Sequence, residues 1–152
     1  MPAPSDTDVL ARLLGRTPRA AFEVAVRGPE GAPLVIRNAP LLDDGTPMPT
    51  RYWLVDPVVR ARVARLESAG GVRAAEAAID PAGLERAHAA YAAERDAALP
   101  AGHVGPRPHG GVGGTRVGVK CLHAHYAYHL AGGNDPVGRW VAEELTREDE
   151  HA

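Results

Sequence analysis

One stretch of the sequence organises the rest: Lys120-Cys121-Leu122-His123-Ala124-His125-Tyr126-Ala127-Tyr128-His129. It contains the only cysteine, the only lysine and three of the seven histidines. The surrounding pattern predicts a helix from about Arg116 to Ala131, because Gly132-Gly133 is a typical helix stop. Its apolar residues lie on nearly every side, which predicts a central, buried helix. We therefore expect any chemistry of this chain to lie on that helix.

Helical geometry divides the reactive side chains of this stretch into two groups. At about 100° per residue, Cys121, His125 and His129 fall along one stripe, whereas Lys120 and His123 lie on other sides. Residues four apart on a helix are a common spacing for two metal ligands, and zinc favours a Cys/His set. The stripe predicts a zinc site through Cys121, His125 and His129.

The same residues have a simpler interpretation, and both remain open at this stage. Cys121 would pack as a small apolar group, and the histidines would hydrogen-bond to the backbone or to carboxylates. A zinc site needs a further ligand from elsewhere, for which Asp56 and His88 are candidates. The position of His88 on an apolar stripe with Leu84 and Tyr91 favours a hydrogen-bonded core histidine instead.

The N-terminal third predicts one helix and three strands. Residues 1–18 read as a helix, capped by Ser5 and running to Leu14, followed by a linker. Alternating apolar residues then predict strands at 20–27, 33–37 and 50–55, with turn residues Gly28-Pro29-Glu30-Gly31 between the first two. We expect these strands to form a small antiparallel sheet.

The rest of the chain, 57–147, predicts helices that begin with one repeated device. Asp56-Pro57, Asp80-Pro81 and Asp135-Pro136 each place a capping Asp before a Pro at the first helical position. We expect helices at 57–70, 72–79, 81–99 and 136–147, and a disordered tail at 148–152. The fold class is α+β: a sheet of about three strands packed against a bundle of about four to five helices, in one domain over 19–147.

The Gly/Pro/His-rich segment 100–114 interrupts the helices. Its end, Gly110 to Arg116, precedes the predicted helix in the manner of an anion-binding loop. The phosphate-loop pattern is not met, however, because Val119 separates Gly118 from Lys120. A flexible hinge is the favoured interpretation, and a loop over a site is the alternative.

Composition narrows the class of protein. The 152 residues suit one domain, and the 17 basic and 19 acidic residues give a net charge of −2, so we expect no nucleic-acid partner and no membrane surface. One cysteine excludes an internal disulfide and is typical of a reducing compartment. No long apolar run opens the chain, which predicts a cytoplasmic protein. No pattern for an organic cofactor is present.

Several motifs together resemble a bacterial family, common in actinobacteria, that is grouped as domain of unknown function 501. They are Leu42 to Leu54 (LDDGTPMPTRYWL), Leu66 to Gly70 (LESAG), His88 with Tyr91, Glu94, Arg95 and Asp96, Val119 to His123 (VKCLH), and Asn134 with Pro136 and Gly138. The resemblance covers about 20–141 and implies no established reaction. Many members have cysteines near the first turn and before the proline matching Pro57, where this chain has Val26 to Gly31 and Asp56. The family's genes often lie near a septum-formation initiator and an exopolyphosphatase-like protein, which implies a link to cell division or the envelope.

Three functions follow from these patterns. The first is metal binding by the stripe on the central helix. The second is a non-catalytic interaction or regulatory module, whose protein partner would dock on Arg51-Tyr52-Trp53 or on the helix of Trp140. The third is a small hydrolase or transferase, in which His123 or His125 acts as a base while Arg51 and Lys120 bind an anionic ligand. That third function requires these groups to share one pocket. Glu94 and Arg95 are expected to form a solvated or salt-bridged edge.

Overall fold

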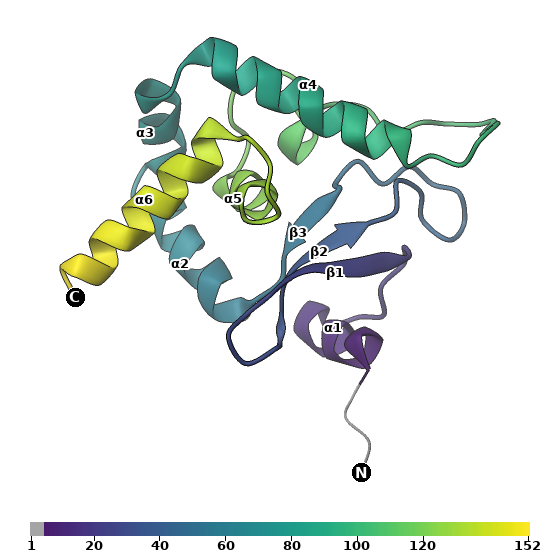
Figure 1. The fold of residues 1–152 in the computed structure, drawn as a ribbon, viewed down its shortest axis with the longest axis horizontal. Coiled ribbons are helices and arrows are strands. Elements are labelled where there is room, and N and C mark those ends of the chain that lie inside the picture. The colour runs from purple at the N-terminus through teal and green to yellow at the C-terminus, as the bar shows by residue number, and fades with distance from the viewer. Residues whose placement is uncertain (1–4) are drawn as a thin grey trace.

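The computed structural model describes residues 5–152 and has the predicted α+β architecture (Figure 1). In chain order the elements are α1 (Asp6–Leu14), β1 (Phe22–Arg27), β2 (Pro33–Asn38), β3 (Tyr52–Leu54), α2 (Pro57–Ser68), α3 (Gly71–Ala78), α4 (Pro81–Ala97), the short 3-10 helix η1 (Val112–Gly114), α5 (Leu122–Leu130) and α6 (Pro136–Glu150). No helix in the described part of the chain is long and apolar enough to cross a membrane.

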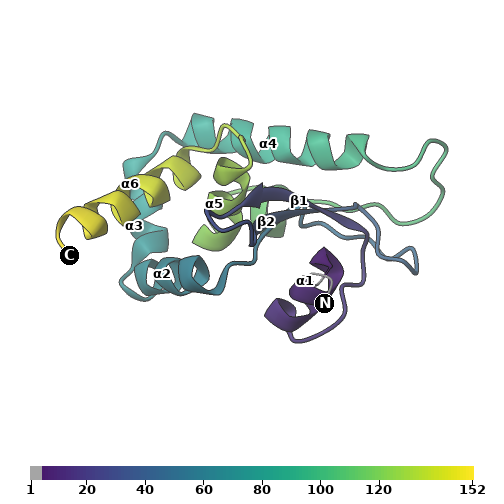
Figure 2. The same cartoon turned by 60° about the horizontal axis from the view of Figure 1, so that its bottom comes forward.

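The three strands form one antiparallel sheet in the order β1-β2-β3. The hairpin register pairs Phe22 with Asn38, and β2 pairs with β3 so that Ile36 lies opposite Trp53. Both faces of the sheet are covered: α1 lies against one face, and α5 lies against the opposite face with α4 beyond it (Figure 2). Adjacent residues Val35 and Ile36 are therefore both buried.

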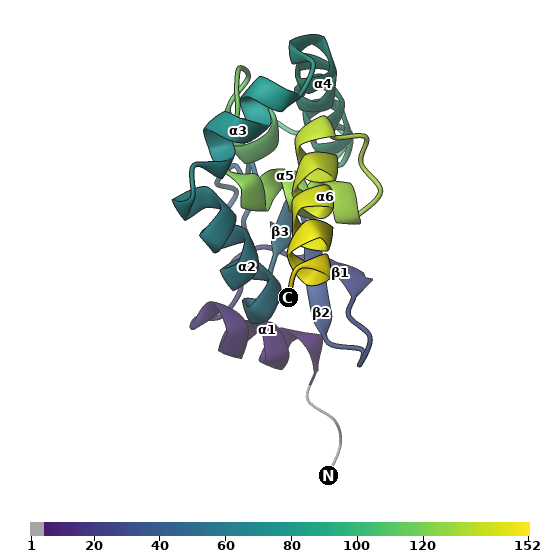
Figure 3. The same cartoon turned by 90° about the vertical axis from the view of Figure 1, so that its left-hand side faces the viewer.

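Helix α5 lies at the centre of the helical part, with α2, α3, α4 and α6 around it (Figure 3). Leu122, His125 and Ala127 are fully buried on this helix. The main core extends from α5 to the sheet and includes Val35 and Leu54. The sequence prediction of a central, buried helix is confirmed.

All three Asp-Pro pairs cap helices as predicted. Asp56 accepts hydrogen bonds from the N–H groups of Val58 and Val59 at 2.9 and 3.0 Å. Asp80 accepts from Ala82 at 3.1 Å, and Asp135 caps α6. These side chains therefore satisfy backbone donors that a helix leaves unpaired at its start.

The predicted disordered tail is partly wrong, because α6 continues to Glu150. Arg62 on α2 holds this last segment: it donates to the carbonyl of Leu145 at 3.0 Å and to Asp149 at 2.9 Å. A second carboxylate, that of Glu148, lies 3.7 Å from the same guanidinium nitrogen. These contacts with another helix keep the charged end of α6 helical.

The predicted start of the central helix is also wrong. Helix α5 begins at Leu122, and Cys121 is extended, with φ −149° and ψ 150°. Gly118 has φ +70°, a left-handed conformation that a regular α-helix does not contain. Two carboxylates from other helices take the backbone donors of this loop: Glu76 accepts from Val119 at 3.2 Å, and Glu67 accepts from Leu122 at 2.8 Å.

The end of the 100–114 segment is fixed rather than hinged. Gly111 packs so closely on His88 that a Cβ there would lie 2.6 Å from the His88 Cβ. Arg95 donates to the carbonyl of Gly110 at 3.0 Å, and Val112 is fully buried. The hinge interpretation is therefore wrong for this part of the segment.

Candidate functional site

A cleft of about 520 Å³ opens beside the loop that precedes α5. Its walls come from the end of α1, from β3 and the residues that flank it, from the first turn of α2, from η1 and from the start of α5. Three residues of the organising stretch with reactive side chains line it: Lys120, Cys121 and His123. The structure thus brings together one part of that stretch at a surface.

Two cationic side chains line this cleft, Lys120 and Arg60, and both are exposed. Neither takes part in any of the ion pairs formed among residues 5–152. Apolar side chains form much of the remaining wall, with Leu14, Trp53 and Val55 among them. The cleft therefore combines unneutralised positive charge with an apolar surface.

His123 is held in place by two oxygen atoms. Its Nδ1 lies 3.0 Å from Glu67 Oε1, and its Nε2 lies 3.1 Å from the carbonyl oxygen of Arg60. Both ring nitrogens are therefore engaged with oxygen atoms of the protein. The structure positions His123 as part of the wall.

Cys121 does not have the surroundings of an activated nucleophile. Burial raises the pKa of its thiol, and the Glu67 carboxylate acts in the same direction. The N–H groups of Ala124 and His123 act in the opposite direction, but the net shift of the thiol pKa is upward. A reactive cysteine needs a lowered pKa, since the thiolate is the nucleophile. The cleft therefore holds a neutral thiol at physiological pH.

His125 lies away from this cleft, in the core. Its Nδ1 lies 2.6 Å from Asp135 Oδ2, and both side chains are fully buried. The other oxygen of Asp135 accepts from the N–H groups of Val137 and Gly138 at 2.9 and 3.2 Å. One carboxylate thus joins α5 to the start of α6. Within residues 5–152, the Nε2 of His125 has no hydrogen-bond partner.

His88 is the hydrogen-bonded core histidine that its position on an apolar stripe favoured. Its Nδ1 accepts from the Val112 N–H at 3.0 Å, and its Nε2 donates to the Gly118 carbonyl at 2.8 Å. Its ring meets that of His125 edge-on, with centroids 5.6 Å apart. Burial lowers the pKa of His88, so the neutral form is favoured.

The predicted zinc stripe is not assembled. Cys121 lies before the helix begins, His125 is bonded to Asp135, and the ring of His129 stacks on Tyr126 with centroids 6.3 Å apart. Asp56 is engaged as a helix cap. Across residues 5–152, no group of three or more Cys, His, Asp and Glu side chains is arranged to hold a metal ion.

Arg51, the other predicted anion-binding residue, does not line the cleft. Its Nη1 donates to the Asn38 carbonyl at 2.8 Å, and its Nε lies 3.7 Å from Glu94 Oε2. The Tyr91 hydroxyl accepts from the backbone N–H groups of Arg51 and Tyr52 at 2.6 and 3.2 Å. These bonds attach β3 to α4, which gives Arg51 a structural role.

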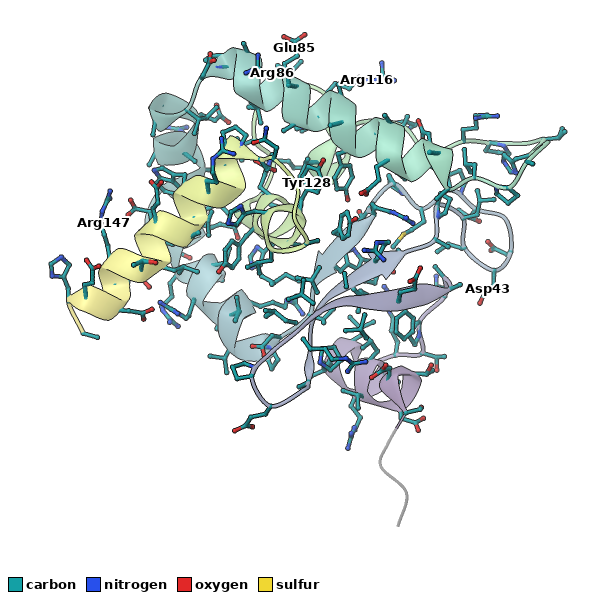
Figure 4. All side chains as sticks on the ribbon, in the orientation of Figure 1. Asp43, Glu85, Arg86, Arg116, Tyr128 and Arg147 are labelled. Carbon is teal, nitrogen blue, oxygen red and sulfur yellow. The ribbon has the colours of Figure 1, made fainter. Side chains whose placement is uncertain are left out.

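Aromatic rings complete the connection between the sheet and the helices. Tyr128 projects from α5 towards α4 and the sheet (Figure 4). It stacks on Tyr52 and meets Tyr91 edge-on, with centroids 5.8 and 5.0 Å away. Burial raises the pKa of Tyr91 to about 12. Tyr52 is therefore a core residue, and the predicted docking edge Arg51-Tyr52-Trp53 lacks its central anchor.

Arg95 forms a salt bridge, one of the two expected arrangements, but its side chain is only 1% exposed and does not lie at a solvated edge. It donates to the carbonyls of Pro49 and Gly110, both at 3.0 Å, and to Asp96 at 3.1 Å. A guanidinium can stay buried when oxygen acceptors surround it. Arg95 ties two loops to α4.

Sequence reasoning missed two members of the site. Arg60 enters the cleft from α2, and Glu67 on the same helix fixes the start of α5. Trp53 was expected only as part of a docking edge, and it also lines the cleft. Glu67 lies in the LESAG motif, which was the one available signal for it. Nothing local in the sequence marks Arg60.

A family model described as a protein of unknown function, DUF501, matches residues 24–143 of the chain. The match includes β2, β3, α2 to α5 and every lining residue of the cleft except Leu14. Comparison with curated proteins and with solved structures gave no match. With most of its length matched, the chain belongs to the DUF501 family of proteins of unknown function.

Proposed function

We propose that this protein binds a small organic anion in the cleft in front of α5. The observation that carries the proposal is the pair Lys120 and Arg60, which reach the same cleft from different parts of the fold and have no acidic partner in the described part of the chain. A surface cation usually contacts water and contributes little through any single ion pair. Two that line one hollow give an anion two charge-assisted contacts.

The shape of the cleft supports a ligand with an organic body. A volume of about 520 Å³ lies within the range of small-molecule sites, which are mostly apolar with a few polar groups. Leu14, Trp53 and Val55 provide the apolar part of the wall. The start of α5 adds the positive end of a helix, since Cys121, His123 and Ala124 also line the cleft.

The same geometry favours binding over covalent catalysis. The thiol of Cys121 is held in its neutral form by burial, and both nitrogens of His123 face oxygen acceptors. A nucleophile and a free base are the two groups that a hydrolase or transferase site would need. The proposal is therefore a binding or regulatory protein whose ligand is an anion.

Calorimetry and amide NMR on the whole chain test the proposal with three related probes: 1-naphthoate, 1-naphthyl phosphate and neutral 1-naphthol. We expect the anions to bind at least about tenfold more tightly than naphthol, the size of one hydrogen bond to a charged group. Binding should shift the amide signals of Gly113, Lys120 and Cys121.

Three variants locate the binding. Lys120→Ala and Arg60→Ala should each lower the affinity for the two anions, whereas Arg65→Ala should leave this affinity unchanged. Arg65 is the matched control, because it is an exposed arginine on the same helix as Arg60 that does not line the cleft. The proposal fails when neither anion binds, or when binding survives in the Lys120→Ala/Arg60→Ala double variant.

A further inference from the structure

Resting on the proposed function, we infer that the ligand is a phosphate monoester carried by a planar apolar body. The inference concerns the charge of the ligand head and the shape of its body. Each follows from a different part of the cleft.

The charge of the cleft indicates a dianion. Lys120 and Arg60 supply two positive charges and form no ion pair among residues 5–152, whereas the Glu67 carboxylate does not line the cleft and accepts from the Leu122 N–H. A carboxylate carries one negative charge and would leave one of the two cations unpaired. A phosphate monoester carries about −1.5 to −2 charges at pH 7 and offers three acceptor oxygens. It matches both cations.

The backbone next to Lys120 leaves room for such a head. Gly113 lines the cleft with φ +70°, and a Cβ at this position would lie 3.4 Å from the Cβ of Lys120 and 3.9 Å from that of Ala124. A side chain would therefore occupy the space between Lys120 and the first turn of α5. Glycine keeps this space open at the charged end.

The apolar end of the cleft indicates what kind of group the phosphate of the ligand is attached to. The volume exceeds that of a bare phosphate, and Trp53 contributes an indole to a wall that also includes Leu14, Leu54 and Val55. Indole rings bind other planar rings by offset or edge-to-face stacking. A planar apolar group attached to the phosphate would therefore fill the remaining volume against Trp53.

The experiment measures affinities for 1-naphthyl phosphate, 1-naphthoate and inorganic phosphate by calorimetry at pH 7.5. We expect naphthyl phosphate to bind at least about tenfold more tightly than either of the others, since each lacks one of its two contacts. Lys120→Ala and Arg60→Ala should each reduce the preference over naphthoate, while Arg65→Ala keeps it. At pH 5 the preference should shrink, because the second phosphate pKa is about 6.

Tryptophan fluorescence locates the planar body. The chain has two tryptophans, so a Trp140→Phe variant leaves Trp53 as the single reporter. Naphthyl phosphate should change its emission, and inorganic phosphate should change it far less. Unaltered Trp53 emission at saturating naphthyl phosphate overturns the placement of the ring.

The remaining outcomes distinguish a failure of this inference from a failure of the proposed anion binding. Equal or tighter binding of naphthoate overturns the phosphate head but leaves anion binding intact. Equal binding of inorganic phosphate overturns the planar body. Absence of binding by every anion removes the proposed function itself.

Discussion

The buried bond between His125 and Asp135 gives the sharpest stability prediction. Asp135→Asn should lower the free energy of unfolding by about 2 kcal/mol, whereas Asp80→Asn should change it by less than about 0.5 kcal/mol. Both residues precede a proline and cap a helix. Only Asp135 also bonds to a buried histidine, so the difference between the two variants isolates that bond.

The magnitude follows from what asparagine retains. Its Oδ1 can still accept from Val137 and Gly138, and asparagine caps helices about as well as aspartate. The 2.6 Å bond to His125 loses its charge, and a bond to a charged group contributes about 1.5–3 kcal/mol. A change of tautomer would let His125 Nδ1 accept from the amide. That change would place an N–H on Nε2, which has no partner among residues 5–152, at a cost of about 1–3 kcal/mol.

Urea unfolding at pH 7, followed by tryptophan fluorescence and circular dichroism, measures both variants against the wild type. The slope of free energy against urea should stay unchanged, because the unfolded chain exposes the same surface. The melting temperature of Asp135→Asn should fall by about 4–8 °C, given about 2–4 °C for each kcal/mol at this chain length. Losses for the two variants that agree within about 0.5 kcal/mol would show that the bond contributes nothing beyond the cap.

Three further outcomes follow from individual contacts. Gly138→Ala should lower the free energy of unfolding by about 1–3 kcal/mol in urea, because the new Cβ would lie 2.3 Å from the Cβ of His129 on α5. Gly83 occupies the same position after an Asp-Pro cap, but its nearest neighbour would lie at 3.6 Å, so Gly83→Ala should be neutral or stabilising by up to about 1 kcal/mol. Equal losses for the two variants would contradict the packing argument. Tyr91→Phe should lower the free energy of unfolding by about 1–2 kcal/mol, because it removes the acceptor for two backbone N–H groups. The hydroxyl of Tyr126 forms no hydrogen bond within residues 5–152, so Tyr126→Phe should lose less than about 0.5 kcal/mol by the same assay. Similar losses for the two variants would refute the role of the Tyr91 hydroxyl. Burial lowers the pKa of His88, so on acidification the unfolded chain binds a proton at this residue, near pH 6.5, before the native chain does. The free energy of unfolding should therefore fall as the pH drops from about 6.5 towards the lowered pKa. His88→Gln should flatten this decline between pH 7.5 and 5, and an unaltered slope would exclude His88 as its cause.

Local patterns were sufficient to predict much of the fold. The period-two alternation before Arg27 and the turn that follows it define a hairpin without tertiary information. The three Asp-Pro caps mark helix starts because both residues act on the first turn alone. Starts of this kind depend on neighbouring residues in the chain, and the structure confirms each one.

The predictions that failed depend on contacts distant in sequence. Helix α5 begins at Leu122, six residues later than predicted, since Glu67 and Glu76 satisfy N–H groups that a longer helix would have used. Arg95 is buried because the carbonyls of two loops converge on it. No periodicity within a single helix contains this information.

The corrected start of α5 changes how the opening stretch works. Lys120, Cys121 and His123 line the cleft, whereas His125, one turn later, bonds to Asp135 in the core. Glu67 fixes the first turn of the same helix from α2, through both Leu122 and His123. The backbone next to Lys120 is therefore held before any ligand arrives, and a site held in place has less conformational entropy to lose on binding. The bond between His125 and Asp135 and the cleft therefore depend on the same helix. The bond fixes α5 against the start of α6, and the N-terminal end of α5 forms part of the cleft wall.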